Sequence, residues 1–493
     1  MYQVTQVLLY SLISLFGHYP IPWLLLFTFL HALNAWMIGK LMTRILNVFA
    51  VSLAEHISLL AAFLFLINPV QTDTLIWKAA LHYLIGLLMM LQIFSWTISF
   101  LQTSERKFVL YILLLYFIST FTLEIFYLTP AFVFCFGLFF FISKKIEVSL
   151  FKKFIRNIFL PMVLIWFTHL LLYHWVYGKW ISHYAVNISD SFSIQNIVSR
   201  LAKYSIHILG MEYFWSNDWR NKFYHFTEKN SFTTLASTAI GLLFNIVFAR
   251  WNKWKHSLRL FTFFAISFML SCTLIIPLWF NDFQLMRNDR YYYLPSVFLL
   301  LLLGTVFYSI PQVKVRNTLI MLYVALCVWG TEKIVWMTKD ATSIFYNLIN
   351  TYRWQDKPLV LLLNLPNNLE GINMIPARGE YFKEHLKVLG NGTPTSNIID
   401  VTSYNRVSLY DGVHITVLND TTIKVTLNQW GTWWWWDSKG ALDYENEYYT
   451  VQFLPTGLDY MLHLKAKAQS ATLIFQTGCE WKEVNKTMKE EQW

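Results

Sequence analysis

The sequence predicts an all-α polytopic membrane protein with a β-rich domain at its C-terminal end, and three observations predict this class. Of the 493 residues, 56% are apolar and only 14% are charged, whereas an average soluble domain has about 25% charged residues. The apolar residues are gathered in runs of about 20, the length that spans a bilayer as a helix. These runs stop near residue 340, and shorter segments typical of strands follow them.

About ten of these runs have the length and composition of membrane-spanning helices. They cover residues 22–39, 50–67, 80–102, 107–123, 128–143, 158–177, 232–250, 259–279, 292–310 and 316–337. Every second loop is basic, and basic loops mark the cytoplasmic side of a membrane protein. These loops contain Lys40 and Arg44; Arg106 and Lys107; Lys144, Lys145, Lys152, Lys153 and Arg156; Arg250, Lys253, Lys255 and Arg259; and Lys314 and Arg316. The other loops, 68–79, 124–128, 178–231 and 280–291, are predicted to face the periplasm or lumen.

Residues 1–340 form the predicted transmembrane domain, in which 178–231 is a large outer loop. Residues 1–16 are apolar but too short to span a bilayer comfortably, so we expect an interfacial helix there. The basic loops place Met1 on the outer side without a preceding span. We therefore expect that a first transmembrane helix is missing from the sequence.

Residues 341–493 are predicted to form a β-rich domain outside the cytoplasm. Segments rich in β-branched and aromatic residues, separated by turn residues, predict strands. These segments are Pro358–Leu365, His414–Leu418, Thr422–Leu427, Tyr449–Phe453, Tyr460–Lys465 and Ala471–Phe475. Asn419 and Asp420 fit a hairpin turn between the second and third of them.

The composition argues against two other classes of function. The formal net charge is +10, but the basic residues lie in short clusters between spans and no nucleic-acid motif accompanies them, so we expect no nucleic-acid partner. Three of the four cysteines fall in apolar segments, and Cys479 stands alone in the tail. No cysteine or histidine spacing predicts a disulfide or a zinc site.

Ionisable residues gather at the predicted outer boundary, where they are costly unless they serve a function. Cations there suit a lipid-linked phosphate, carboxylates suit an acceptor hydroxyl or a metal ion, and aromatic rings suit a sugar. The candidates for catalysis are Asp73 and Glu124, and the candidates for substrate binding are Arg290, Asp289, Tyr291, Lys78 and Gln71.

Three of these candidates also have a purely structural explanation. Asp73 would serve as a helix N-cap, Arg290 as a general binder of lipid headgroups, and Glu124 as one half of a structural pair. His31, inside an apolar span, is better explained as an interhelical hydrogen-bonding residue than as a catalyst. The run Trp433–Trp436 is better explained by a β-sheet core or an interfacial belt than by sugar stacking.

Five stretches, in order along residues 2–380, carry a family resemblance: residues 31–34, 68–73, 124–130, 289–296 and 363–371. They resemble motifs of the GT-C superfamily of membrane glycosyltransferases. The likeness is to the branch of the transmembrane-and-tetratricopeptide O-mannosyltransferases, of the dolichyl-phosphate-mannose type, and their bacterial relatives. Residues 31–34 resemble its H-A-x-N segment, 68–73 its H-P-x-x-T-E loop, 124–130 its K-E-x-x-x-x-x-P element, and 289–296 its E-R-Y-x-Y-L-P-S block. Residues 363–371 resemble an L-N-L-P-D-N-x-x-G stretch of bacterial members.

The resemblance implies a GT-C-like helical bundle that transfers a sugar from a polyprenyl-phosphate donor to a protein or glycan acceptor on the extracytoplasmic face. By position, Asp73 would help to bind the acceptor or a metal, and Arg290 would hold the lipid phosphate. Whether a divalent metal takes part is left open, and no other cofactor is expected. The bacterial likeness implies an inner-membrane location with a periplasmic tail.

This sequence departs from the family in its first outer loop. The family's principal catalytic acid follows its first helix, and both are absent before Met1. Truncation of this kind would impair activity. Two alternatives to a transferase remain: a lipid-linked glycan transporter or polymerase, and a non-catalytic membrane scaffold that presents the β-rich domain.

Overall fold

The computed structural model describes the chain except for residues 1–2, 18, 52, 179, 181–192, 216, 231–256, 277–288, 352–356, 370–371, 374–396, 407, 428–430, 435–441 and 486–493. The described residues are mostly helical up to Thr351 and mostly in strands after it. They divide into two compact units, a first that ends at Thr331 and a second that begins at Glu332. The predicted span at 232–250 lies outside the described residues.

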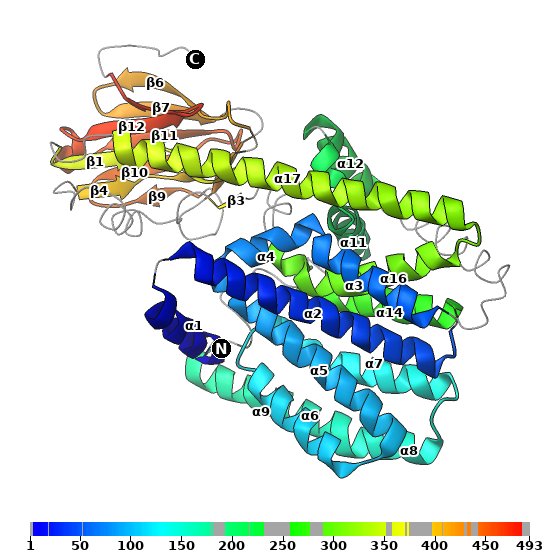
Figure 1. The fold of residues 1–493 in the computed structure, drawn as a ribbon. Helices are drawn as coiled ribbons and strands as arrows, with labels where there is room; N and C mark the ends of the chain where they lie inside the picture. The colour runs from blue at the N-terminus through cyan, green and yellow to red at the C-terminus, as the bar shows by residue number, and fades with distance from the viewer. Residues whose placement is uncertain are drawn as a thin grey trace. The chain divides into compact units, whose positions relative to one another are not determined.

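The first unit is a bundle of mostly apolar helices (Figure 1). Its α-helices are α1 (Gln3–Phe16), α2 (Pro20–Val48), α3 (Ala54–Ile67), α4 (Thr72–Ile76), α5 (Leu81–Thr103), α6 (Arg106–Ser119), α7 (Thr129–Ile142), α8 (Val148–Phe154), α9 (Leu160–Tyr177), α11 (Ile194–Ile208), α12 (Asn217–Lys229), α14 (Ser257–Cys272), α16 (Tyr293–Ser309) and the first part of α17 (Val313–Thr351). Among the described residues, six helical segments are long and apolar enough to cross a membrane, or seven if the bent pair α3–α4 counts as one span.

The helices differ in length from several predicted spans. α6 and α14 have 14 and 16 residues, so both are shorter than the runs 107–123 and 259–279 that predicted them. α17 continues past residue 337, the predicted end of the last span, to Thr351. The last part of α17 belongs to the second unit, where Ala341, Ile344 and Phe345 are buried against strand residues, and this packing stabilises the helix beyond residue 337. The prediction of ten spans stays a prediction.

Close packing of small and aromatic residues holds the bundle together. A Cβ atom on Gly304 would lie 3.2 Å from Cβ of Ala61, so this glycine lets α16 and α3 approach closely. Phe132 of α7 stacks on Phe298 of α16 with ring centroids 5.0 Å apart. In contrast, Leu25 and Phe29 of α2 are more than 60% exposed, as expected of side chains that face lipid.

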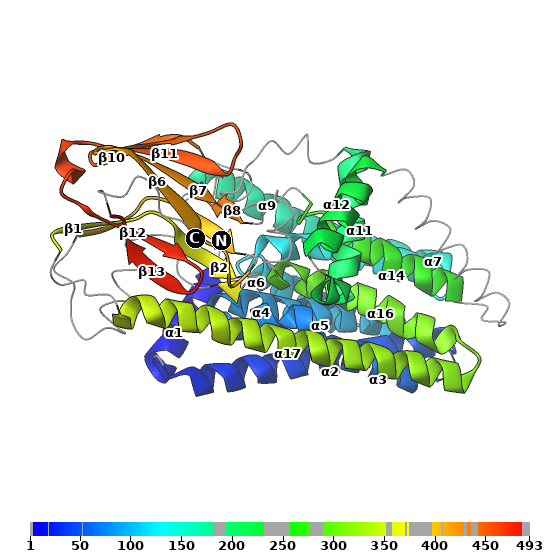
Figure 2. The ribbon, with the colours of Figure 1, turned by 90° about the horizontal axis from the view of Figure 1, so that it is seen from above.

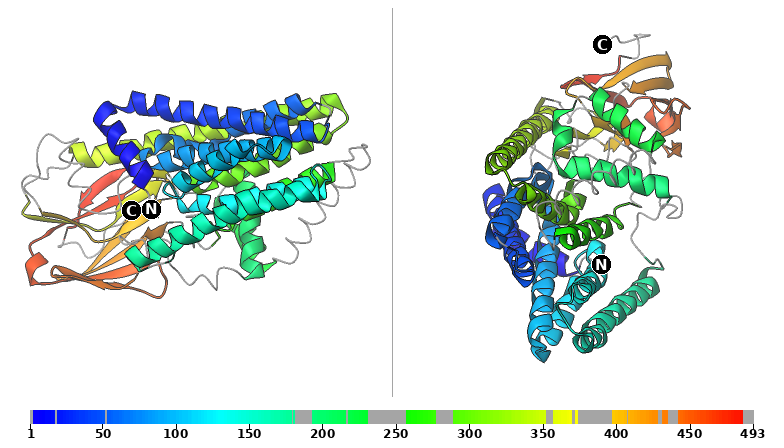
Figure 3. Two further views of the ribbon diagram at one scale, coloured as in Figure 1. Left: turned by 90° about the horizontal axis from the view of Figure 1, so that it is seen from below. Right: turned by 90° about the vertical axis from the view of Figure 1, so that its right-hand side faces the viewer.

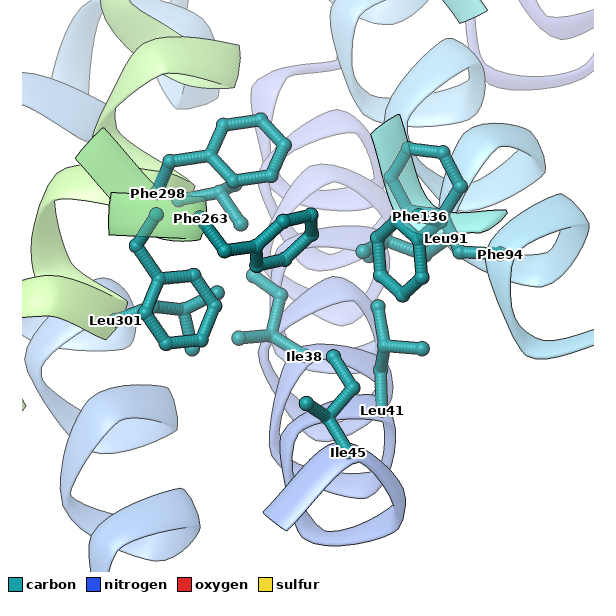
Figure 4. A pocket seen from close by; sticks show the side chains of 11 residues that line it. Ile38, Leu41, Ile45, Leu91, Phe94, Phe136, Phe263, Phe298 and Leu301 are labelled. Atoms are coloured by element: carbon teal, nitrogen blue, oxygen red, sulfur yellow. The ribbon is translucent and has the colours of Figure 1, made fainter. Parts of the chain in front are cut away.

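A small cavity lies at the centre of this packing, between α2, α5, α7, α14 and α16 (Figure 4). Its volume is about 10 Å³. All its lining residues are apolar, among them Leu41, Phe94 and Phe263. A void of this size without polar partners does not retain a water molecule. It is a packing defect of the core and not a substrate site.

Two helices of the first unit run crosswise to the long helices such as α2 and α16 (Figures 1 and 3). They are α11 and α12, which contact one another. The buried face of α11 is polar, because it includes Ser199, Lys203 and His207. Neither α11 nor α12 is among the helices long and apolar enough to cross a membrane, and α11 leads directly to the polar cluster described below.

The second unit contains three small sheets. Their strand orders are β13-β12-β1-β4, β6-β7-β11-β10-β9 and β3-β2-β5-β8. The strands are β1 (Leu359–Leu362), β2 (Leu365–Leu369), β3 (Ile372–Asn373), β4 (Asn397–Asp400), β5 (Ser403–Arg406), β6 (Val413–Asn419), β7 (Thr422–Leu427), β8 (Thr432–Trp434), β9 (Tyr444–Glu445), β10 (Tyr449–Phe453), β11 (Asp459–Leu464), β12 (Thr472–Thr477) and β13 (Glu480–Glu483). Figure 2 shows β6, β7, β11 and β10 side by side.

All six predicted strands are present, with ends that shift by at most three residues. The predicted hairpin turn is confirmed, since β6 and β7 pair antiparallel and Asn419 lies opposite Thr422. Alternate residues of β7, Ile423, Val425 and Leu427, are buried in the core of the unit. This period of two is what a strand with one buried face requires.

One glycine of the second unit is required by a close approach of two backbones. A Cβ atom on Gly412 would lie 2.5 Å from Cα of Thr477. The two residues also form an antiparallel bridge. Any larger residue at position 412 would separate them.

Candidate functional site

The structure brings Asp73 and Arg290 together. Nη1 of Arg290 lies 3.3 Å from Oδ2 of Asp73, and the backbone N–H of Arg290 donates to the same oxygen over 3.4 Å. Both side chains keep a small exposed fraction, 10% for Asp73 and 14% for Arg290. Paired charges this well buried are costly to separate, about 3–5 kcal/mol when one partner is removed.

Local sequence places Asp73 in this position. Pro69 cannot donate to the hydrogen-bond ladder of α3, and the helix axis bends by 53° there. The side-chain oxygen of Asn68 accepts a hydrogen bond from the backbone of Val70, and its amide donates to the carbonyl of Ile208 in α11. The chain then continues into α4, whose first turn contains Asp73. The N-cap interpretation of Asp73 was wrong, because Gln71 occupies that position.

Aromatic rings flank the guanidinium of Arg290. Its carbon Cζ lies 4.3 Å from the ring centre of Trp77 and 4.9 Å from that of Tyr291. The ring of Tyr291 also meets that of Tyr83 edge to face. A cation over such rings is held by their negative faces. The predicted binding residue Tyr291 therefore does lie beside Arg290.

A second group of charges continues from Arg290 through its neighbour Asp289. Oδ1 of Asp289 lies 2.7 Å from Nε2 of His207, and Oδ2 accepts a hydrogen bond of 3.0 Å from the hydroxyl of Tyr213. The other ring nitrogen of His207 lies 3.0 Å from Oε2 of Glu212. All four side chains are buried. We call His207, Glu212, Tyr213 and Asp289 the histidine cluster.

A glycine turn assembles the histidine cluster. Gly210 follows α11 with φ of +74°, a left-handed conformation that glycine adopts without strain. It reverses the chain into the short helix η5 (Met211–Phe214), which contains Glu212 and Tyr213. Asp289 begins another short helix, η6 (Asp289–Tyr292), at the start of α16.

The charges in the histidine cluster shift its proton affinities. Burial lowers the pKa of the His207 imidazole, but Asp289 and Glu212 outweigh burial and raise the pKa to about 10. Burial, followed by the charge of Asp289, raises the pKa of the Tyr213 hydroxyl well above its ordinary value. His207 is therefore an imidazolium at neutral pH and Tyr213 a neutral hydrogen-bond donor.

The other predicted residues have contacts of their own. Gln71 is buried and its amide donates to the hydroxyl of Ser296 over 2.8 Å. The ammonium of Lys78 lies 5.0 Å from the ring centre of Trp23. Glu124 begins the short helix η3 (Glu124–Leu128) and lies near the hydroxyls of Tyr127 and Tyr173. The roles predicted for these three residues stay predictions.

Two structural explanations are confirmed. The ring nitrogens of His31 lie 3.0 Å from the hydroxyl of Tyr293 and 3.2 Å from the carbonyl of Leu66, so this histidine links three helices. Trp433 is buried in the core of the β-rich unit, and its indole N–H donates to the carbonyl of Leu458. Trp435 and Trp436 lie outside the described residues.

The sequence did not single out His207, and it gave no role to Tyr213 or Trp77. Glu212 was visible as a charged residue in an aromatic loop, but nothing local pairs it with His207. A signal for the cluster is present in the sequence of α11. Its polar residues Ser199, Lys203 and His207 recur every four positions on one helical face, and Gly210 follows the end of the helix.

The described residues contain no group of three or more His, Cys, Asp or Glu side chains placed to hold a metal ion. In the same residues, Asp289 is committed to His207 and Tyr213 through both of its oxygens. A metal ion at Asp73 would therefore need ligands other than Asp289. The predicted metal role of Asp73 stays a prediction.

Comparison with known proteins assigns no family. No protein-family model matches the chain, and no curated protein and no solved structure matches it at a significant level.

Proposed function

We propose that this protein is a membrane glycosyltransferase of the GT-C type, which transfers a sugar from a polyprenyl-phosphate donor to an acceptor on the extracytoplasmic face. The observation that supports it is the ion pair between Asp73 and Arg290, which is mostly buried but keeps a small exposed fraction and is set at the end of an apolar helical bundle. A lipid-linked phosphate donor needs this combination of an apolar surround and a cation near the headgroup level.

Arg290 has donors to spare for a phosphate. Within the part of the chain that the structure describes, its Nε and Nη2 groups make no hydrogen bond. The contact to Asp73 uses one nitrogen and is long at 3.3 Å, compared with about 2.7–2.9 Å for strong charge-assisted bonds. Guanidinium binds phosphate oxygens in a bidentate manner, so a phosphate competes well with the carboxylate of Asp73.

Displacement of Asp73 by a phosphate would free its carboxylate for the acceptor. In the proposed reaction, the acceptor hydroxyl oxygen attacks the anomeric carbon, and the bond from that carbon to the phosphate oxygen breaks. The phosphate stays on the lipid with the bonding electron pair, next to Arg290. Asp73 accepts the hydroxyl proton, as a general base within reach of the acceptor.

The aromatic residues fit the same proposal. Trp77 and Tyr291 hold the guanidinium between them, and rings at a membrane boundary also provide flat surfaces against which sugar rings stack. The lipid donor, membrane lipids and a protein or glycan acceptor are the proposed partners. We propose the bacterial inner membrane as the location, with the β-rich unit in the periplasm.

Sugar transfer from a radiolabelled polyprenyl-phosphate sugar, measured in membranes that contain the full chain, tests the proposal. We expect transfer by the wild type and loss of transfer in Arg290→Ala. Arg44→Ala is the matched control, because Arg44 is a partly buried arginine held by Ser95 and Ser99, neutral residues of α5. Equal transfer by Arg290→Ala and the wild type would overturn the proposal. Movement of the intact lipid-linked sugar without transfer would support a transporter instead.

A further inference from the structure

The histidine cluster and the Asp73–Arg290 pair form one continuous series of alternating charges. Its order is Glu212, His207, Asp289, Arg290 and Asp73. Neighbours in the series are joined by contacts of 2.7–3.3 Å, apart from Asp289 and Arg290, which are consecutive in the chain. Three carboxyl groups therefore face two cations, and all five side chains are largely buried.

The geometry around His207 favours its charged form. A neutral imidazole has one N–H group and one lone pair, so it would turn a lone pair toward one of the two carboxylates. The imidazolium donates to both, to Glu212 over 3.0 Å and to Asp289 over 2.7 Å. The aromatic rings of Tyr213 and Tyr292 also lie against the imidazole.

The cluster also fixes the rotation of η6. In a helix with about three residues per turn, consecutive side chains point about 120° apart. Asp289 points to α11 and η5, while Arg290 points to α4. Because both oxygens of Asp289 are bound, by His207 and by Tyr213, η6 cannot turn without breaking two buried contacts. Tyr292, the last residue of η6, packs against the rings of His207 and Tyr204.

We infer that His207 is a positioning residue, which holds the guanidinium of Arg290 toward Asp73 through Asp289 and needs its positive charge to do so. Its importance for donor binding rests on the proposed function, but the placement of Arg290 does not. Neutralising His207 leaves two carboxylates facing an uncharged ring, so Asp289 and the backbone of η6 move and Arg290 loses its orientation.

Chemical modification of Arg290 by phenylglyoxal measures this placement without any substrate. The reagent attacks free guanidinium groups faster than paired ones, and mass spectrometry of the detergent-solubilised full chain reports each arginine separately. We expect His207→Gln to raise the modification rate of Arg290 several-fold, while the rate of Arg44 stays constant. Tyr213→Phe, which removes one of the two anchors of Asp289, should give a smaller increase.

Two matched variants separate charge from general damage. The double variant His207→Gln with Glu212→Gln removes one charge of each sign and retains an amide that can donate to Asp289. It should return the rate of Arg290 toward that of the wild type. His169→Gln changes another buried histidine, on α9, and should leave the rate unchanged.

The outcomes are distinct. An unchanged rate for Arg290 in both His207→Gln and Tyr213→Phe would overturn the inference, and so would equal increases in the single and the double variant. Failure of the proposed function would appear differently, as absence of sugar transfer by a wild-type protein in which Arg290 still responds to His207→Gln.

Discussion

Nη1 of Arg290 lies 3.3 Å from Oδ2 of Asp73, although 217 positions separate the two residues in the chain. Each would be costly alone at the end of an apolar bundle, and among the residues that the structure describes the pair leaves Nε and Nη2 of Arg290 without a hydrogen bond. In the proposed reaction the pair has two states, the ion pair seen in the structure and one in which an anion replaces the carboxylate. The first two predictions follow from this exchange.

Arg290→Lys should weaken binding of a lipid phosphate more than it weakens the fold. Lysine keeps the charge but loses the planar fork, so at least one charged hydrogen bond, worth about 1.5–3 kcal/mol, is lost. That corresponds to about a 10- to 100-fold higher Kd. Dodecyl phosphate binding to the solubilised protein, measured by calorimetry, checks this. A Kd equal to that of the wild type would show that a point charge is sufficient.

Asp73→Asn should separate binding from transfer. Without the competing carboxylate, Arg290 binds dodecyl phosphate several-fold more tightly, whereas sugar transfer falls because the proposed base is gone. Asp73→Glu is the control, since it keeps the charge. Weaker binding in Asp73→Asn would mean that Asp73 contributes to the phosphate site instead of competing for it.

Stability should fall as the pH rises from about 6.5 to about 10 because of His207. Below this range both the folded and the unfolded chain bind the proton, and the contribution of His207 is fully present. Within the range the unfolded chain has lost the proton while the folded chain keeps it, so the free energy of unfolding decreases. Above about pH 10 the contribution is gone.

Thermal unfolding of the solubilised protein between pH 6 and pH 10 measures this dependence. The slope of Tm against pH should be shallower in His207→Gln than in the wild type or in His169→Gln. Parallel curves for all three proteins would contradict the assignment of a raised pKa to His207.

Gly412→Ala should destabilise the β-rich unit. Its Cβ atom would meet the backbone of Thr477 at 2.5 Å, so the two chain segments must separate. A cost of about 1–3 kcal/mol is typical of overpacking in a well-packed site. Tyr410→Ala, at a side chain that is 85% exposed, is the control and should be nearly neutral. Amide hydrogen exchange at β12, which contains Thr477, should be faster in Gly412→Ala than in the wild type and unchanged in Tyr410→Ala.

Elements governed by local pattern were predictable from the sequence. Burial in lipid requires long apolar runs, and these predicted the major helices. The strands β7 and β10 have the predicted bounds, Thr422–Leu427 and Tyr449–Phe453, because alternation of apolar residues depends only on neighbours. By contrast, β5 (Ser403–Arg406) was not predicted, because its residues are polar although all four are buried.

The site was predictable only in part, because most of its contacts join residues that are far apart in the sequence. Asp73 and Arg290 were recognisable as charges at a membrane boundary, and the structure joins them. The contact of His207 with Asp289 spans 82 positions and depends on the rotation of η6, which no periodicity reveals. The long continuation of α17 depends similarly on contacts with strands of the second unit.

The central claim is that a lipid-linked phosphate binds between Asp73 and Arg290. A photoreactive polyprenyl-phosphate analogue, crosslinked to the full chain in membranes and mapped by mass spectrometry, tests it most directly. The account predicts crosslinks in peptides that contain residues 71–78 and 289–293, and their loss in Arg290→Ala. Crosslinks confined to the basic loop at residues 144–156, with none near Arg290, would contradict it.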